Sequence, residues 1–203
     1  YLDGLASIRR TAGLAWHVHF KFKRVQPDGR DAQVDHDEVL RVLDAKDGGP
    51  LWQKKIFLGN DDNQGKGPRG TPLVEGDRVY VQTMRGEFQC LATADGALRW
   101  RKNFVDDFGA VFMGEISNQK SIGATRHGNN GSPVIDGDRI IVQAGGLSGA
   151  SVVCLDKRTG AVVWKSQDDP AGYAAAILAE LAGVRQVVGY TALGVIGLGP
   201  RDG

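Results

Sequence analysis

The sequence predicts an all-β fold built from a repeated four-stranded antiparallel sheet, and three observations support this. A ten-residue phrase occurs as LDAKDGGPLW, LATADGALRW and LDKRTGAVVW, and a fourth copy, LGPRDG, begins at Leu198. Upstream of two copies, GTPLVEGDRVYVQ from Gly70 and GSPVIDGDRIIVQ from Gly131 match position by position. Glycine makes up 29 of 203 residues, about twice its usual share, which suits a chain with many tight turns. Repeats of this length with four strands are typical of β-propeller blades.

The phrase itself predicts two strands joined by a short turn. An aspartate at its start can accept backbone N–H groups, and its glycine suits the position where the chain needs a positive φ. The closing tryptophan carries roughly 150–250 Å² of surface, which one small sheet cannot bury alone. We therefore expect the tryptophans to be covered by neighbouring repeats. The residues with these structural roles are Asp44, Asp156, Gly48, Gly96, Gly160, Trp52, Trp100 and Trp164.

The repeats divide the whole chain, 1–203, into about four blades of one propeller, the last of them incomplete. Alternating apolar and polar residues set the strands. In the second repeat the four strands are expected near Thr71–Val74, Val79–Thr83, Glu87–Ala92 and Ala97–Asn103. The blades themselves are expected at residues 1–56, 70–104, 131–166 and 173–203.

The first and last blades need separate justification. In the first, Ser7–Arg10 is expected to form a weak inner strand and Ala15–Val25, which alternates strongly, the second strand. In the last, the alanine-rich segment Tyr173–Leu181 favours a helix by propensity alone. The repeat register predicts a strand there instead, with a turn at Ala182-Gly183 and a further strand at Val184–Tyr190, because packing context commonly overrides propensity.

The phrase resembles the tryptophan-docking motif A-x-D-x-x-T-G-x-x-x-W of pyrroloquinoline-quinone (PQQ)-like propeller repeats, and the resemblance covers nearly the whole chain. The family includes quinoprotein dehydrogenases and the outer-membrane assembly lipoprotein BamB. This chain departs from the motif where Ala92 replaces the aspartate and where Asp47, Asp95 and Asp202 replace the threonine. Complete relatives commonly have seven or eight blades, so the resemblance implies that the chain is a piece of a larger ring.

Composition narrows the function classes. Lys and Arg number 25 against 24 Asp and Glu, so no charge argument for nucleic-acid binding follows. No apolar run approaches the roughly 18 residues of a membrane span, and no signal peptide is visible. Cys90 and Cys154 occupy the same position in two repeats, about one blade apart. We expect two buried thiols rather than a disulfide, because the Cα atoms of a disulfide lie within ~7 Å.

Candidate binding residues gather where loop lengths vary. The tryptophan spacing lengthens after Trp100, and the extra residues fall in connections that share one face of the disc. Variable loops on a rigid scaffold usually mark a working surface. On this loop-rich face a group of basic and amide side chains could bind an anion or a quinone carboxylate, although turn and capping roles are the alternative. These candidates are Arg69, Arg126, His127, Asn129 and Asn130. No metal site is predicted, since His17 and His19 share a strand face without a third ligand.

Three functions remain open. The resemblance to BamB implies a non-catalytic propeller without a cofactor, which binds a protein or small ligand through the loop-rich face in the periplasm or cell envelope. The resemblance to quinoproteins implies a dehydrogenase that holds PQQ and calcium. Its catalytic aspartate, flat tryptophan and adjacent cysteine pair cannot be located in this sequence. The third alternative is the sensor ectodomain of a larger protein.

Overall fold

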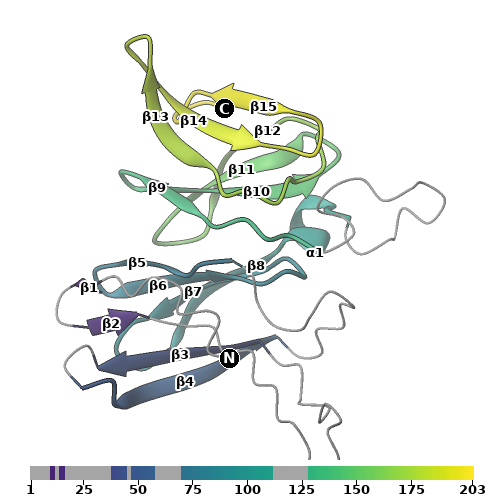
Figure 1. Cartoon of the computed structure of the whole chain (residues 1–203). Helices are drawn as coiled ribbons and strands as arrows, with labels where there is room; N and C mark the ends of the chain where they lie inside the picture. The colour runs from purple at the N-terminus through teal and green to yellow at the C-terminus, as the bar shows by residue number, and fades with distance from the viewer. Residues whose placement is uncertain (1–9, 12–13, 17–37, 45–46, 58–69, 112–127) are drawn as a thin grey trace, which may run out of the picture. The chain divides into compact units, whose positions relative to one another are not determined.

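The computed structural model describes residues 10–11, 14–16, 38–44, 47–57, 70–111 and 128–203. These residues form four antiparallel sheets, each with its strands in chain order, and one short helix (Figure 1). The chain divides into two compact units, Tyr1–Pro68 and Arg69–Gly203. The prediction of an all-β fold with four-stranded antiparallel blades is therefore confirmed.

The first unit holds one sheet, blade 1. Its strands are β1 (Arg10–Thr11), β2 (Leu14–Trp16), β3 (Glu38–Asp44) and β4 (Pro50–Phe57). Leu40, Val42 and Ile56 are buried in this unit. Of the predicted inner strand Ser7–Arg10, only Arg10 is a described residue, and it lies in β1. Of the second predicted strand, Ala15–Val25, the structure describes only Ala15 and Trp16, both in β2.

The second unit contains three consecutive sheets. Blade 2 consists of β5 (Leu73–Glu75), β6 (Arg78–Gln82), β7 (Glu87–Ala92) and β8 (Leu98–Asn103). Blade 3 consists of β9 (Val134–Asp136), β10 (Arg139–Gly146), β11 (Ala150–Asp156) and β12 (Val162–Ser166). Blade 4 consists of β13 (Ile177–Leu181), β14 (Val184–Tyr190) and β15 (Val195–Leu198). The four strands of blade 2 and β14 lie within two residues of their predicted bounds, whereas β13 begins at Ile177 rather than Tyr173.

The sheets of the second unit pack face to face. Between blades 2 and 3, aromatic side chains of blade 2 lie against aliphatic side chains of β10 and β11 in one cluster. Within it, the Phe88 and Trp100 rings meet edge to face, with centroids 5.3 Å apart. Between blades 3 and 4, Cys154 and Trp164 share a second cluster with Val187 and Leu198. A small blade cannot bury such rings by itself, so their burial between sheets is the main apolar contribution to its stability.

One helix was not predicted. α1 (Phe104–Phe108) follows β8 directly, in a connection for which the sequence predicted no helix. Asn103 caps it by accepting hydrogen bonds from the N–H groups of Val105 (2.9 Å) and Asp106 (3.2 Å). Gly109, with φ of 67°, closes it. Phe104 and Phe108 lie four residues apart on the buried face and extend the cluster between blades 2 and 3.

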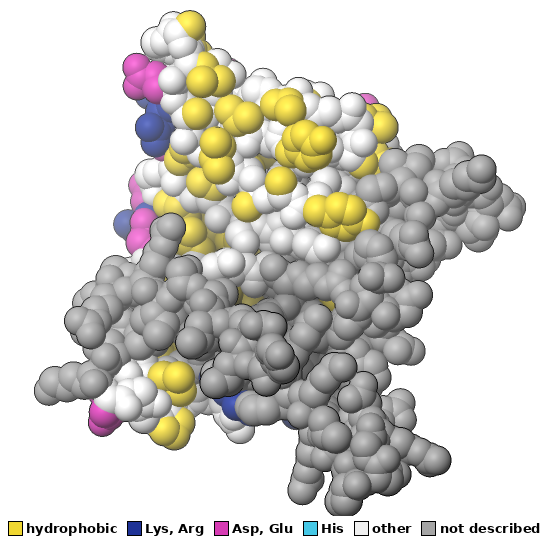
Figure 2. All heavy atoms as spheres, in the orientation of Figure 1, with side chains coloured by type: hydrophobic (Ala, Val, Ile, Leu, Met, Phe, Trp, Pro, Cys, Tyr) yellow, Lys and Arg dark blue, Asp and Glu magenta, His cyan; other side chains and the backbone are white. Residues whose placement is uncertain are grey.

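The alanine-rich segment of blade 4 forms a strand, as the repeat register predicted. β13 pairs with β14 from Ile177–Val188 to Leu181–Val184, and Ala182-Gly183 forms the turn, with φ values of 52° and 76°. One face of the blade packs on blade 3. The other carries exposed apolar side chains, and Figure 2 shows such side chains gathered over this blade. The exposed residues of this open face are Ile177, Leu181, Val184, Tyr190 and Val195.

Candidate functional site

The residues predicted to form an anion site on the loop-rich face are only partly visible. Arg69, Arg126 and His127 lie outside the described residues. Asn129 is 1% exposed, and its Oδ1 accepts hydrogen bonds from Gln82 Nε2 (2.6 Å) and from the Gly131 N–H (3.1 Å). Its Nδ2 donates to the carbonyl oxygen of Gln143. Gln82 belongs to blade 2 and Gln143 to blade 3, so the side chain of Asn129 links these two blades.

Glutamines at one repeated position extend this pattern. Gln82 ends β6, and Gln143 stands at the same place in β10. Gln82 reaches Asn129, in the segment that leads into blade 3, and Gln143 Nε2 donates to the Ala174 carbonyl (2.8 Å), in the segment that leads into blade 4. Each glutamine therefore joins its own blade to the start of the next one.

Asn130 differs from Asn129. It is partly exposed, and its Oδ1 atom is buried without a hydrogen-bond partner among the described residues. A buried acceptor without a donor costs free energy, so a bound group that donates here would be favoured. Asn130 is thus the one predicted site residue in the described part of the chain whose side chain retains unused hydrogen-bonding capacity.

The tryptophans of blades 2 and 3 meet the turn of the following blade. Trp100 Nε1 donates to the Lys157 carbonyl oxygen (3.1 Å), and Trp164 Nε1 donates to the Pro200 carbonyl oxygen (3.2 Å). Lys157 and Pro200 hold the same third position of their phrases. Both indoles are 8% exposed. Trp52 belongs to the first unit, where its side chain is partly exposed.

The phrase turns share one backbone geometry. The glycine N–H bonds the carbonyl oxygen four residues earlier in all four copies: Gly48 to Asp44, Gly96 to Ala92, Gly160 to Asp156 and Gly203 to Gly199. These glycines have φ between 72° and 87°, the left-handed region in which a side chain is strained.

Side-chain hydrogen bonds support these turns. Asp156 Oδ1 accepts bonds from Arg158 N (3.0 Å) and Thr159 N (2.8 Å). The hydroxyl and backbone N–H of Thr159 lower the pKa of the Asp156 carboxyl below its usual value. Thr159 Oγ1 accepts a hydrogen bond from Ala161 N (3.2 Å). In blade 2, where Asp95 stands in place of the threonine, Asp95 Oδ1 accepts the equivalent bond from Ala97 N (2.9 Å). The replacement of threonine by aspartate therefore preserves the hydrogen bond.

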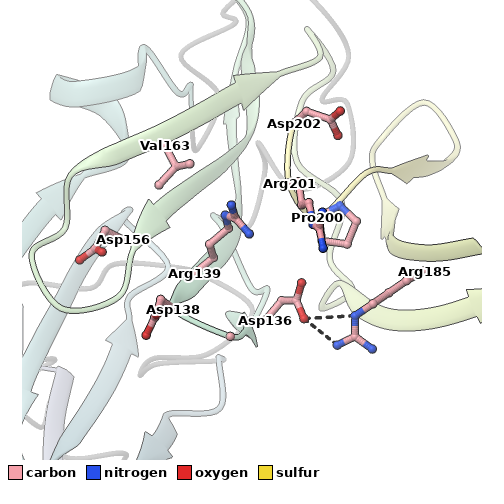
Figure 3. Close-up of a pocket in the computed structure, with 10 residues that line it drawn as sticks. Asp136, Asp138, Arg139, Asp156, Val163, Arg185, Pro200, Arg201 and Asp202 are labelled. Atoms are coloured by element: carbon pink, nitrogen blue, oxygen red, sulfur yellow. Dashed lines mark hydrogen bonds and ion pairs between the residues drawn. The ribbon is translucent and has the colours of Figure 1, made fainter.

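A pocket of about 720 Å³ opens between blades 3 and 4 on the side of the tight turns (Figure 3). Asp136 and Arg185 face each other across the two blades, joined by bonds from Arg185 Nε (3.1 Å) and Nη2 (2.6 Å) to Asp136 Oδ1. Sequence reasoning did not identify this pocket. Its lining residues are Asp136, Gly137, Asp138, Arg139, Asp156, Val163, Arg185, Pro200, Arg201 and Asp202.

The two cysteines are free and buried, as predicted. Burial raises the pKa of both the Cys90 and the Cys154 thiol to about 11. Across the described ranges, no three His, Cys, Asp or Glu side chains converge to hold a metal ion. None of the helices in these ranges is long and apolar enough to cross a membrane.

A calcium ion beside PQQ would need several converging oxygen ligands. The described residues bring no three Asp or Glu side chains together, and the side chain of Asn129, predicted to bind an anion or a quinone carboxylate, bonds Gln82 and Gln143.

The family model of the outer membrane protein assembly factor BamB matches residues 36–203. No curated protein is similar enough to the chain to count as a relative. Among solved structures, BamB from Moraxella catarrhalis is 20% identical, with a TM-score of 0.55, over 81% of this chain and 44% of that one.

Two enzymes are equally similar. A quinohemoprotein alcohol dehydrogenase from Comamonas testosteroni is 19% identical, with a TM-score of 0.56, over 82% of this chain and 32% of that one. A europium-containing methanol dehydrogenase is 17% identical, with a TM-score of 0.60, over 96% of this chain and 39% of that one. At these identities the likeness shows the fold alone. The chain spans less than half the length of each of these three structures.

Proposed function

Because the chain belongs to the family of the outer membrane protein assembly factor BamB, we propose that it is a non-catalytic scaffold that binds a protein in the cell envelope. The binding surface in this proposal is the loop-rich face, which carries α1 and the connections β10–β11 and β14–β15. The process it serves is the assembly of outer membrane proteins. The family includes both assembly factors and quinoprotein enzymes, so the choice between them depends on the surface of this chain.

The observation that carries the proposal is the set of exposed apolar side chains on the loops of this face. Leu147 and Leu193 occupy the connections between the second and third strands of blades 3 and 4, and are 40% and 69% exposed. Val105 in α1 and Tyr173 before β13 are also exposed. Large apolar side chains on a scaffold's loops suit a protein partner, whose contact surface is enriched in such groups.

The proposal is tested in cells that lack the full-length protein. The wild-type gene is expected to restore the normal amounts of outer membrane proteins, measured by quantitative mass spectrometry of the membrane fraction. The double variant Leu147→Glu with Leu193→Glu should fail, because two charges on the loops oppose an apolar contact. Val162→Glu is the control, since Val162 is 44% exposed but lies on the outer strand β12. Full restoration by the double variant would contradict the proposed surface.

A second measurement addresses the enzymatic alternative directly. The purified full-length protein is mixed with PQQ and calcium chloride, its absorbance is scanned, and dye-linked oxidation of alcohols is followed. We expect neither uptake of the quinone nor reduction of the dye. Stoichiometric quinone uptake with dye reduction would replace the scaffold proposal with a dehydrogenase.

A further inference from the structure

The connections on the loop-rich face bond one another from α1 to blade 4, so they form one surface. Ala110, two residues after α1, forms an isolated β-bridge with Gly146 at the end of β10, and Figure 1 shows α1 beside this end of the strand. In the β10–β11 connection, the Gly149 N–H donates to Asp168 Oδ1 (2.5 Å). α1, this connection and the segment after β12 therefore lie next to one another.

The β14–β15 connection belongs to the same surface. The Ala192 N–H donates to the Pro170 carbonyl oxygen (2.9 Å), and the Thr191 hydroxyl donates to Asp169 Oδ2 (2.7 Å). Each of the joined segments carries an exposed apolar side chain, so an extended segment of a partner can contact several of them at once. These side chains are Val105 on α1, Leu147 on the β10–β11 connection, Tyr173 after β12 and Leu193 on the β14–β15 connection.

The charge of this surface has one sign. The segments 104–111, 144–150, 167–176 and 190–195 contain four aspartates and no Lys or Arg. In the described connections that the second unit places on this face, the one basic residue is Arg85, in the β6–β7 turn of blade 2. The part of the face formed by α1 and blades 3 and 4 is therefore acidic. Its acidic residues are Asp106, Asp107, Asp168 and Asp169.

Most of this negative charge is not neutralised within the described part of the chain. Lys102 of β8 lies 3.4 Å from Asp107 and offsets one charge. Asp168 and Asp169 accept hydrogen bonds from uncharged donors, an amide and a hydroxyl. Asp106 is exposed and has no ion pair with any described residue. Three carboxylates therefore remain available to the cations of a partner, beside exposed apolar side chains.

Building on the proposed function, we propose that this face binds a basic and partly apolar segment of its protein partner, whose Lys or Arg side chains pair with the aspartates and whose apolar side chains contact Leu147 and Leu193. Hydrogen bonds from cationic groups to carboxylates are shorter and stronger than those between neutral groups. Complementary charge also speeds association and disfavours wrong partners. An acidic polypeptide or an anionic membrane surface would be repelled by the same aspartates.

The test uses the full-length protein and a fluorescein-labelled peptide of sequence LKVRLKV, with binding followed by fluorescence anisotropy at low salt. The triple variant Asp106→Asn, Asp168→Asn and Asp169→Asn should weaken binding about tenfold, because it removes three charges that pair with the peptide. Asparagine keeps an oxygen that can accept from Gly149 or Thr191, so the connections retain their hydrogen bonds.

The matched control removes the same number of charges on the side of the tight turns. Asp95→Asn, Asp138→Asn and Asp202→Asn change exposed aspartates in turns of blades 2, 3 and 4. This variant has the same net charge as the first one, and its binding should stay near the wild-type value. The peptide LEVELEV, with the same apolar residues, should not bind. Equal weakening by the two triple variants would overturn the proposal, as would binding of the acidic peptide or an absence of binding by the basic one.

The same variants in cells separate this proposal from the proposed function. Should Leu147→Glu with Leu193→Glu fail to restore the outer membrane proteins while the variant of Asp106, Asp168 and Asp169 restores them fully, the face binds a partner that is not basic, and the basic segment alone is refuted. Full restoration by the leucine variant would refute the surface itself. Thermal unfolding of each variant is measured alongside. The single variant Asp106→Asn, whose carboxylate has no described partner to lose, keeps the test decisive if the triple variant does not fold.

Discussion

The contact between Trp100 and Gly160 offers a direct test of how neighbouring blades hold together. Gly160 has φ of 74°, and a methyl group added there would lie 2.8 Å from Trp100 Cδ2 and 2.9 Å from Cε3. Real Cβ atoms essentially never come so close to another heavy atom. Gly160→Ala must therefore displace either the indole ring or the turn that carries the glycine.

The magnitude has two parts that can be separated. A left-handed backbone costs a non-glycine residue roughly 1–2 kcal/mol. Overpacking at a close contact costs typically about 1–3 kcal/mol more. Gly137→Ala provides the control, because Gly137 has φ of 58° in the same blade but no atom lies within 4 Å of its added methyl group. The control carries the backbone cost alone, so we expect Gly160→Ala to be the more destabilising by about 1–3 kcal/mol.

The assay is urea unfolding followed by circular dichroism, with tryptophan fluorescence recorded in parallel. Gly160→Ala should lower the unfolding midpoint further than Gly137→Ala and should change the native emission, since the indole environment changes. Trp100→Phe removes a second interaction of the same indole with blade 3, the bond from Nε1 to the Lys157 carbonyl oxygen. Equal destabilisation by the two glycine variants would show that the ring does not press on Gly160, and the described packing would be wrong.

Three further predictions concern individual residues. Asn129→Ala should destabilise the protein by about 1–3 kcal/mol in urea unfolding, because it leaves buried partners such as Gln82 unsatisfied; unchanged stability would favour a ligand-binding role. Cys90 and Cys154 should react with iodoacetamide at pH 8 only after unfolding. Burial raises the pKa of each thiol from 9.0 to about 11, so the native state retains protons that the unfolded state releases, and stability should fall as pH rises between 9 and 11. A double Cys→Val variant that keeps the same pH slope would refute this cause. Asp95→Thr should change stability by less than about 0.5 kcal/mol, whereas Asp95→Ala should cost about 1 kcal/mol, because only alanine lacks an acceptor for the Ala97 N–H; equal losses in thermal unfolding would contradict the equivalence of the two acceptors.

The repeat register predicted most of the strands because the same physical constraints recur in every copy. Each glycine with positive φ fixes a turn, and the alternating residues on either side then have only one way to face a neighbouring sheet. The strand at Ile177–Leu181 shows the strength of this constraint. Its alanine-rich sequence favours a helix, yet pairing with β14 and packing on blade 3 decide its structure.

The repeat register did not predict α1. It lies in a connection without a counterpart in the other repeats, so no comparison between copies could predict it. Its signals were local: Asn103 as a cap, Gly109 as a stop, and two phenylalanines one helical turn apart. A helix of five residues is too short for periodicity to reveal, and its stability comes from burying Phe104 and Phe108 against neighbouring blades.

The candidate sites were harder to predict because the same types of polar residue can bond one blade to the next or bind a ligand. Asn129 and Asn130 are adjacent. The side chain of Asn129 bonds Gln82, Gln143 and Gly131, whereas Asn130 Oδ1 has no hydrogen-bond partner among the described residues. Sequence alone cannot separate them, since the difference depends on which side of the segment faces Gln82 and Gln143. The exposed Leu147 and Leu193 were likewise invisible, because exposure within a loop has no periodic pattern.

At the third position of the phrase, the backbone has the same role in blades 3 and 4 while the side chain differs. In blades 3 and 4 the backbone carbonyl at this position accepts the tryptophan of the preceding blade, a bond that any residue can make. The side chain is therefore free to differ without weakening that contact. Lys157 uses this freedom to bond Glu75 of blade 2, whereas Pro200 lines the pocket between blades 3 and 4. A repeat that holds its blades by backbone groups can in this way change its surface one joint at a time.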